Sequence, residues 1–506
     1  MGKKRLTINL ITNLLSYGAS IVIQFFLTPF LVGHLGKEVF GYYGLATDVV
    51  NYVKIISIAL NSLAAKYITV ELVRGHKIKA EQYFSSIFIS NIALSVFLTP
   101  VLTVIVVWIR SFFKIGAAHV RDVQILFALV FLTMIVNLIN SVFGCATYAT
   151  NRVDLRAYTQ LGWALLRIGL YVLIFKVFPA SIVYVGIVAL ILEVYNCVMQ
   201  IVWKRKLLPD LHVRRRSFDL KLVFDTLKVG MWNSLNHLGD LLLSSVDRIA
   251  ANIMIDETAS GDIAIVKQMP SLISGVITAI NGVFMPRVAT RYAENDKNAL
   301  VKEVHLAQRI MGVFATPVVM MLMIFGREFF TLWVPGNDAD LLMRLNILDV
   351  SRMMLIGVVW PVSNLNVMMD KIKIPSLLVI VSGAANLAGM FLLIRYTGVG
   401  IYAIPLTTLI LTILFYGIFI PIYPCKELGL SRWTFFDPVW EMLISAGVIA
   451  AVVIPLKKLF VIRGWATFIL YGGICGVIAL GISVVVFVKP RNIGKAITKV
   501  RKKLHI

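Results

Sequence analysis

Residues 465–488 read WATFILYGGICGVIALGISVVVFV, a stretch without a single charged side chain. A helix of this length rises about 1.5 Å per residue and crosses the hydrocarbon core of a bilayer, which is about 30 Å thick. Similar apolar blocks recur along the whole chain of 506 residues. We count about fourteen of them, the last two at 438–460 and 465–488, and each is close to the ~20 residues that one transmembrane helix needs. The sequence therefore predicts an all-α, polytopic membrane protein.

The composition excludes most other classes of protein. The chain is 59% hydrophobic and 15% charged, with a mean hydropathy of +0.85. Soluble domains are roughly 45–50% apolar and about 25% charged, so a soluble or disordered chain is excluded. The four cysteines are widely separated and form no CxxC pair, which supports neither a disulfide scaffold nor a metal site. We predict no cofactor and leave coupling to H⁺ or Na⁺ open.

The basic residues follow a topological pattern. The net charge of +23 comes from 49 Lys and Arg against 26 Asp and Glu. With the N-terminus inside, most of these cations fall in inner segments such as 204–228 and the tail after Lys489, as the positive-inside rule requires. No basic stretch is interleaved with stacking aromatics, so we expect no nucleic acid partner. Both termini are therefore expected in the cytoplasm.

An internal repeat divides the chain. A shift of 220 residues lays the predicted spans 9–33 and 40–67 on the predicted spans 229–255 and 260–286, with identities such as Gly41/Gly261 and Asn61/Asn281. We predict two pseudo-symmetric six-helix lobes around a central cavity, followed by two further helices. The predicted parts are an N-terminal lobe at 1–203, a basic cytoplasmic linker at 204–228, a C-terminal lobe at 229–421, and a helix pair with a basic tail at 422–506.

Polar side chains line one face of the first two helices in each half. An ionised group at the centre of a spanning helix costs about 2.5–3.5 kcal/mol, so each charge must have a partner or face water. One interpretation is a structural pair, such as Asp247 with Arg248 or Lys267. The other, which we favour, is an aqueous cavity between the halves, as in many transporters. The polar faces include Asn13, Gln24, Asp48, Lys54, Asn61, Asn233, Asp240, Asp247, Arg248, Lys267 and Asn281.

Other charges inside predicted helices have simpler interpretations. Asp349 and Arg352 are three residues apart on one helix face, which predicts a local ion pair. Arg167 and Glu193 fit an interhelical pair as well as a role in ligand binding.

The helix order resembles that of the multidrug/oligosaccharidyl-lipid/polysaccharide exporter superfamily, most of all its bacterial lipid-linked oligosaccharide flippases for O-antigen, capsule or teichoic acid. Six helices, a basic loop, six more helices and a terminal pair carry the resemblance over essentially the whole chain. Lipid II flippases of this group are arginine-rich in the first helix, whereas this chain has Gln24 and Thr28 there, which argues against lipid II as substrate. The matching motifs are Leu27-Thr28-Pro29 to Gly41-Tyr42-Tyr43, Val246-Asp247-Arg248, Gly261 to Lys267-Gln268, and Met285-Pro286-Arg287.

The resemblance implies a flippase that moves an undecaprenyl-diphosphate-linked oligosaccharide from the inner to the outer leaflet of the bacterial plasma membrane by alternating access. It implies no enzyme activity, a monomer among membrane lipids, and contact with other polysaccharide-assembly proteins. Cations suit the diphosphate, and amides suit sugar hydroxyls. The expected substrate-binding residues are Lys54, Lys267, Arg248, Asn13, Gln24, Asn61, Asn233, Asn281 and Gln268, and those expected for a coupling ion or charge pair are Asp240, Asp247 and Asp48.

Two other functions remain open at this point. A cation-coupled multidrug antiporter of the same superfamily would use Asp240 and Asp247 to bind the cation or drug. A membrane glycan polymerase would need an acid, a base or a metal exposed in a loop, and we find no such cluster in the sequence.

Overall fold

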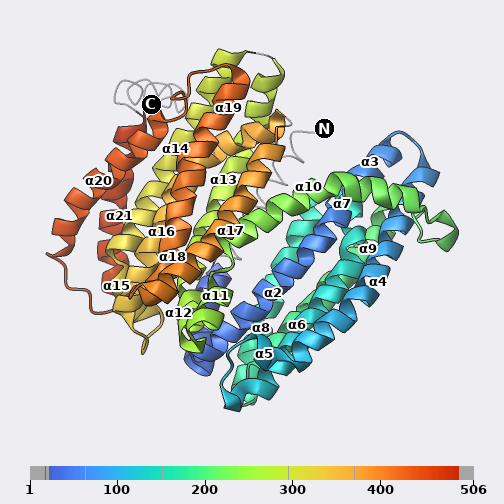
Figure 1. Ribbon diagram of the computed structural model, residues 1–506, viewed down its shortest axis with the longest axis horizontal. Helices are drawn as coiled ribbons and strands as arrows, with labels where there is room; N and C mark the ends of the chain where they lie inside the picture. Colours follow the sequence, from blue (N-terminus) through green and yellow to red (C-terminus); the bar gives the residue numbers. More distant parts are fainter. Residues whose placement is uncertain are drawn as a thin grey trace, which may run out of the picture. The chain divides into compact units, whose positions relative to one another are not determined.

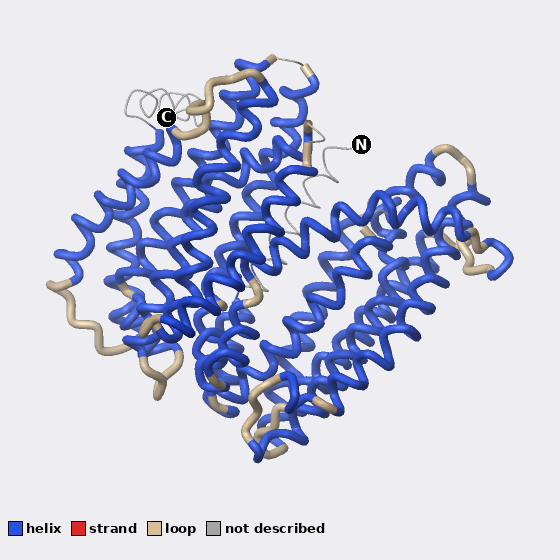
Figure 2. The backbone as a smooth tube through the Cα atoms, in the orientation of Figure 1, coloured by secondary structure: helices blue, strands red, loops and turns tan. Residues whose placement is uncertain are grey.

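The computed structural model describes residues 18, 22–62, 64–150, 152–294, 296–369 and 371–488, and these residues form helices and connecting loops without a strand (Figure 2). The predicted all-α class is confirmed. The chain divides into two compact units, Met1–Ala264 (unit 1) and Ile265–Ile506 (unit 2). This division follows packing rather than the internal repeat, so the lobes predicted from the repeat stay a prediction.

Unit 1 is a bundle of long helices. Within it, α6 packs between α4 and α9, α8 packs on α9, and α10 packs along α2 (Figure 1). Short helical turns connect several of the long helices. The helices are Val22–Leu35, α2 (Lys37–Asn61), α3 (Ala64–Val73), α4 (Lys77–Val107), α5 (Ile109–Phe112), α6 (Val120–Asn140), α7 (Cys145–Ala149), α8 (Val153–Val177), α9 (Val183–Leu207), α10 (Leu220–Ser244), α11 (Asp247–Ala250) and α12 (Glu257–Val266).

Unit 2 is built around α14, which packs on α13, α16, α20 and α21. The last two helices are the predicted terminal pair, and Arg309 on α14 binds Glu441 on α20 through two hydrogen bonds of 2.8 Å. The helices are α13 (Gln268–Ala293), α14 (Lys297–Ile324), α15 (Gly326–Trp333), α16 (Ala339–Met368), α17 (Lys373–Tyr396), α18 (Ala403–Thr412), α19 (Ile420–Leu428), α20 (Asp437–Lys457) and α21 (Trp465–Val488).

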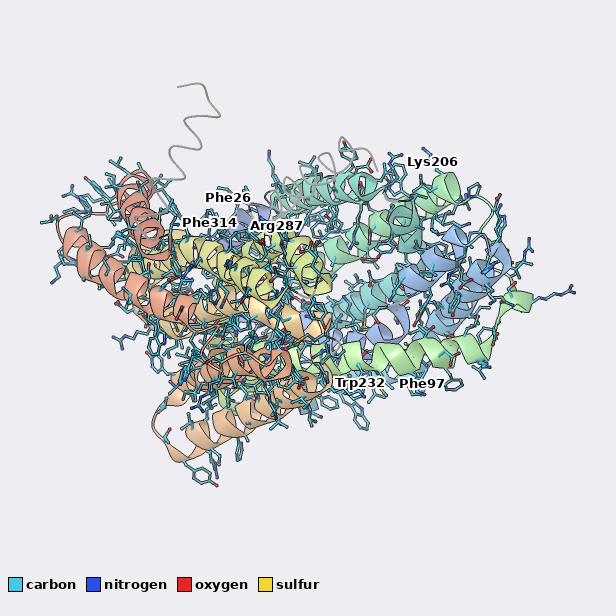
Figure 3. All side chains as sticks on the ribbon, turned by 90° about the horizontal axis from the view of Figure 1, so that it is seen from above. Phe26, Phe97, Lys206, Trp232, Arg287 and Phe314 are labelled. Atoms are coloured by element: carbon cyan, nitrogen blue, oxygen red, sulfur yellow. The ribbon has the colours of Figure 1, made fainter. Side chains whose placement is uncertain are left out.

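Eleven helices within the described residues are long and apolar enough to span a membrane. Large apolar side chains such as Phe97 point outward from them, as expected for helices in contact with lipid (Figure 3). Neither α10 nor α13 is among the eleven, because polar and charged side chains interrupt their apolar faces. About half of the first predicted span, 9–33, lies outside the described residues. The count of fourteen therefore stays a prediction.

The helices that carry the predicted polar faces are interrupted. The predicted span 229–255 consists of the end of α10, the short helix α11 and a π-helical turn, Ala251–Ile255. The predicted span 260–286 is broken at Lys267, between α12 and α13. Such breaks expose backbone polar groups, which membrane proteins tolerate where the backbone is buried in protein or lines water.

Helix α2 lies very close to α10 and α12. A Cβ atom built on Gly230 of α10 would lie 1.9 Å from the carbonyl oxygen of Ala59. A Cβ on Gly41 would lie 3.0 Å from the Cα of Gly261, so these two repeat-related glycines face each other. The absence of side chains at these positions brings the helices together.

We expect Gly230→Ala to destabilise the protein by about 1–3 kcal/mol, because the new methyl group would collide with backbone. Thermal unfolding of the purified protein in detergent measures this effect. Gly169→Ala is the matched control, since no atom lies within 4 Å of that position on α8, and alanine there should be neutral or stabilising by up to about 1 kcal/mol. Equal melting temperatures for Gly230→Ala and wild type would contradict the close helix crossing.

Candidate functional site

A buried ion pair joins α2 to α11 in unit 1. Arg248 Nε donates to Asp48 Oδ2 at 2.6 Å, and the Arg248 Nη2 group binds the other carboxylate oxygen. The side chain of Asp48 is 0% exposed and that of Arg248 is 18% exposed. Gly44, one turn before Asp48, makes room for the guanidinium, because a Cβ there would lie 3.0 Å from Arg248 Nη1. The sequence suggested Asp247 as a partner of Arg248, but these hydrogen bonds go to Asp48.

Lys54 lies further along α2 and is half-buried. Within the part of the chain that the structure describes, no carboxylate lies within ion-pair distance of its ammonium group. Glu193 on α9 is the acid that acts on it electrostatically. The Glu193 carboxylate accepts hydrogen bonds from the side-chain amides of Asn137, at 3.0 Å, and Asn196, at 3.4 Å. Lys54 thus combines a positive charge with a polar surrounding inside a membrane-spanning helix.

Arg167 does not form the interhelical pair with Glu193 that the sequence suggested. Its guanidinium instead lies over the ring of Trp163 on the same helix, 5.2 Å from the centroid. An arginine on an aromatic face gains a cation–π interaction and needs no carboxylate.

Asn61 at the end of α2 belongs to a different kind of polar cluster. Its side-chain amide exchanges hydrogen bonds of 3.0 and 2.9 Å with that of Asn91 on α4, and Ser141 Oγ donates to it at 2.9 Å. These bonds tie α2 to α4 and to the end of α6. Asn61 therefore has protein partners for its polar atoms, which favours a structural role over the predicted contact with substrate.

In unit 2, Lys267 takes part in a buried triad. Lys267 Nζ lies 3.2 Å from Asp349 Oδ1, and Arg352 Nε lies 2.8 Å from the same oxygen. The expected local pair of Asp349 with Arg352 is therefore present, and Lys267 joins it. The side chain of Asp349 is 1% exposed and that of Lys267 is 12% exposed. One carboxylate oxygen of Asp349 thus binds two cations.

The other predicted residues are distributed over both units. Asn281 is buried and accepts a hydrogen bond of 3.2 Å from Asn364. Asn13 and the side chain of Asn233 lie outside the described residues. The predicted central cavity, lined by polar residues of both halves of the chain, stays a prediction. Gln24 and Gln268 are half-buried, Asp247 is buried, and Asp240 is exposed on α10.

Sequence reasoning missed the amides that surround Glu193. A signal was present, since Glu193, Asn196 and Gln200 follow one another at helical spacing on α9 and form one polar face. Asn137 lies on another helix, α6, and only packing shows that its amide contacts Glu193.

The triad predicts strongly non-additive variants. Lys267→Ala or Arg352→Ala alone leaves Asp349 with one counter-ion, so we expect a small loss of stability. The double variant leaves a buried carboxylate uncompensated, which should cost about 3–5 kcal/mol. A double-mutant cycle of thermal unfolding measures the coupling. Adding Asp349→Asn to the double variant should restore most of the lost stability. If the losses of the two single variants simply added up in the double variant, the two cations would not share the Asp349 carboxylate.

Comparisons of the sequence and of the structure with known proteins give relatives that agree with one another. The sequence profile described as "Polysaccharide biosynthesis protein" matches residues 6–291. The membrane protein EpsK of Bacillus subtilis (strain 168) is 25% identical over 468 residues, which is 92% of each chain. An inward-facing multidrug resistance MATE family transporter of the MOP superfamily covers 84% of this chain and 97% of its own, with a TM-score of 0.68 and 16% identity. The lipid II flippase MurJ in an inward closed conformation covers 96% and 99%, with a TM-score of 0.65 and 12% identity. The resemblance inferred from the sequence is thereby confirmed, and the two solved structures share the fold.

Proposed function

Because the chain belongs to the family of polysaccharide biosynthesis proteins, we propose that it is a flippase for lipid-linked oligosaccharides. Its substrate is an undecaprenyl-diphosphate-linked glycan, which it moves from the inner to the outer leaflet of the bacterial plasma membrane by alternating access. The head group crosses through the protein while the lipid tail stays in the bilayer. Both termini lie in the cytoplasm in this proposal.

The observation that carries the proposal is the environment of Lys54. A cation inside a spanning helix is costly and is retained where it has a partner or a ligand. No carboxylate among the described residues forms a salt bridge with Lys54, so its ammonium group is available to a diphosphate. A charge-assisted hydrogen bond between ammonium and phosphate is about twice as strong as a neutral one.

Two other cations predicted to bind substrate, Arg248 and Lys267, differ from Lys54 because each has a carboxylate partner. Arg248 is held by Asp48, and Lys267 is held by Asp349. A phosphate would have to displace a buried carboxylate to bind either of them fully. We therefore assign the first contact with the diphosphate to Lys54. Arg248 and Lys267 contribute a positive electrostatic potential, which their paired acids reduce.

Transport in vesicles tests the proposal. The purified chain is reconstituted into liposomes that hold an undecaprenyl-diphosphate oligosaccharide in both leaflets, and a membrane-impermeant glycosidase is added outside. We expect the inner-leaflet glycan to become accessible only when the protein is present. Continued protection of that glycan, in vesicles whose protein is folded, would overturn the flippase proposal.

One observation favours a second candidate, a cation-coupled multidrug antiporter. Asp240 is an acid on a helix that the sequence places in the membrane, and an acid at such a position suits a cationic drug or a coupling ion. The same liposomes, loaded with ethidium and given a sodium or proton gradient, separate the two candidates. Efflux of ethidium without any movement of the glycan would establish the antiporter instead.

A further inference from the structure

The loop between α9 and α10, residues 208–219, is firmly attached to α4. Ser85 Oγ accepts from the backbone N–H of Arg214 at 3.1 Å, and Ser86 Oγ accepts from that of Asp219 at 2.9 Å. Leu211 inserts into a buried cluster that includes Phe84. A loop that served only to connect two helices would not need these anchors.

The anchors also engage the nearby acids. Glu81 on α4 accepts a hydrogen bond of 3.1 Å from Ser217 and lies 3.4 Å from the guanidinium of Arg214. Asp210 pairs with Lys77 at 3.1 Å. These two carboxylates are therefore occupied by Arg214, Ser217 and Lys77, and that of Asp219 accepts from the backbone N–H of Lys221 at 2.8 Å.

Arg215 and Arg216 form an exposed helical turn, Arg215–Ser217, and no ion pair of theirs is present among the described residues. Apolar side chains flank them on both sides. Phe218 is exposed, and on the first turns of α10 Leu220 is 54% exposed and Phe224 is 62% exposed. The loop thus presents two positive charges beside a row of exposed apolar groups.

The position of the loop indicates what covers this surface. It follows α9 directly, a helix long and apolar enough to span a membrane whose last turn carries Lys204, Arg205 and Lys206. Lys206 extends from the surface at this end of α9 (Figure 3). The loop therefore lies where the chain leaves the bilayer, at the depth of lipid head groups. Basic residues at this depth gain about 1 kcal/mol each from an anionic membrane surface.

We propose that residues 213–224 form a binding site for anionic phospholipids. Arg215 and Arg216 bind the lipid phosphate groups, and Phe218, Leu220 and Phe224 enter the boundary between head groups and acyl chains. Guanidinium groups suit this task because they form paired hydrogen bonds with phosphate oxygens. The rigid attachment to α4 fixes the spacing of the two arginines before lipid binds, which lowers the entropy lost on binding.

Native mass spectrometry and lipid titration of the full-length protein in detergent test this site, with phosphatidylglycerol and phosphatidylcholine as probes. We expect wild type to prefer phosphatidylglycerol. Arg215→Gln with Arg216→Gln should weaken phosphatidylglycerol binding by about 30-fold and leave phosphatidylcholine binding unchanged. The variant with lysine at both positions should keep most of the preference. Thermal unfolding confirms that each variant is folded, as expected for exposed positions.

The matched control is Arg110→Gln with Arg121→Gln. These two arginines are also exposed, but they lie beyond the other end of α4, and we expect the preference to persist in this variant. Equal phosphatidylglycerol affinity for wild type and the glutamine variant at 215 and 216 would overturn the proposal. It would also be overturned if that variant lost binding of a soluble acidic polypeptide while its lipid preference stayed the same, since the surface would then serve a protein partner.

Discussion

Replacing Arg248 by methionine should destabilise the protein by about 3–5 kcal/mol, the usual cost of leaving a buried charge without its partner. Asp48 is fully buried, and each of its carboxylate oxygens accepts a hydrogen bond from the Arg248 guanidinium. Without that group the carboxylate would remain in a medium that solvates it poorly. The unfolding midpoint in detergent and the yield of folded protein in membranes measure the effect.

The double variant Asp48→Leu with Arg248→Met separates stability from transport. Removing both charges eliminates the unpaired carboxylate, so we expect most of the lost stability to return. If this stable double variant does not transport the glycan, the pair also acts in transport, as the sequence predicted for both residues. Wild-type stability of Arg248→Met alone would contradict the structural role of the pair.

The helices were predictable where the apolar stretch alone decides the structure. The spans predicted at 438–460 and 465–488 correspond to α20, Asp437–Lys457, and α21, Trp465–Val488. The start of α10 at Leu220 was not predicted, because its first turns are amphipathic and read as part of the basic linker. The breaks at residues 245–246 and 267 were also missed. Polar residues such as Ser245 and Lys267 stand there, but similar polar residues also occur inside intact helices of this chain and do not mark a break by themselves.

The sequence predicted the residue types of the candidate site and the local pair of Asp349 with Arg352, but it did not predict the pair of Asp48 with Arg248. Arg248 and Asp48 are 200 residues apart in sequence, whereas Asp247 is adjacent to Arg248. Neighbouring residues on a helix point in different directions, so adjacency in the sequence is a poor guide to a side-chain pair. The same reason explains Glu193, whose partner Asn137 belongs to another helix and could not be found from spacing within α9.

Lys54→Gln should reduce glycan transport about 10- to 100-fold while leaving thermal stability nearly unchanged. The loss corresponds to one hydrogen bond to a charged group, worth about 1.5–3 kcal/mol. Stability should persist because Lys54 holds no carboxylate among the described residues. Initial rates in the liposome assay and melting in detergent measure the two quantities. Lys66→Gln, at an exposed position on α3, is the matched control and should transport normally.

Two further variants show whether the charge of Lys54 itself is what the substrate needs. Lys54→Arg keeps the charge and should retain most of the transport. Glu193→Gln removes the acid that acts on Lys54 and should strengthen substrate binding, because the ammonium group would then face the diphosphate without competition. If Lys54→Gln instead melts as early as Arg248→Met, Lys54 is a structural charge. If Lys54→Gln transports at the wild-type rate, the diphosphate must be bound by Arg248 or Lys267, which already have carboxylate partners. Entry of the substrate would then have to break the Asp48–Arg248 or the Lys267–Asp349 ion pair.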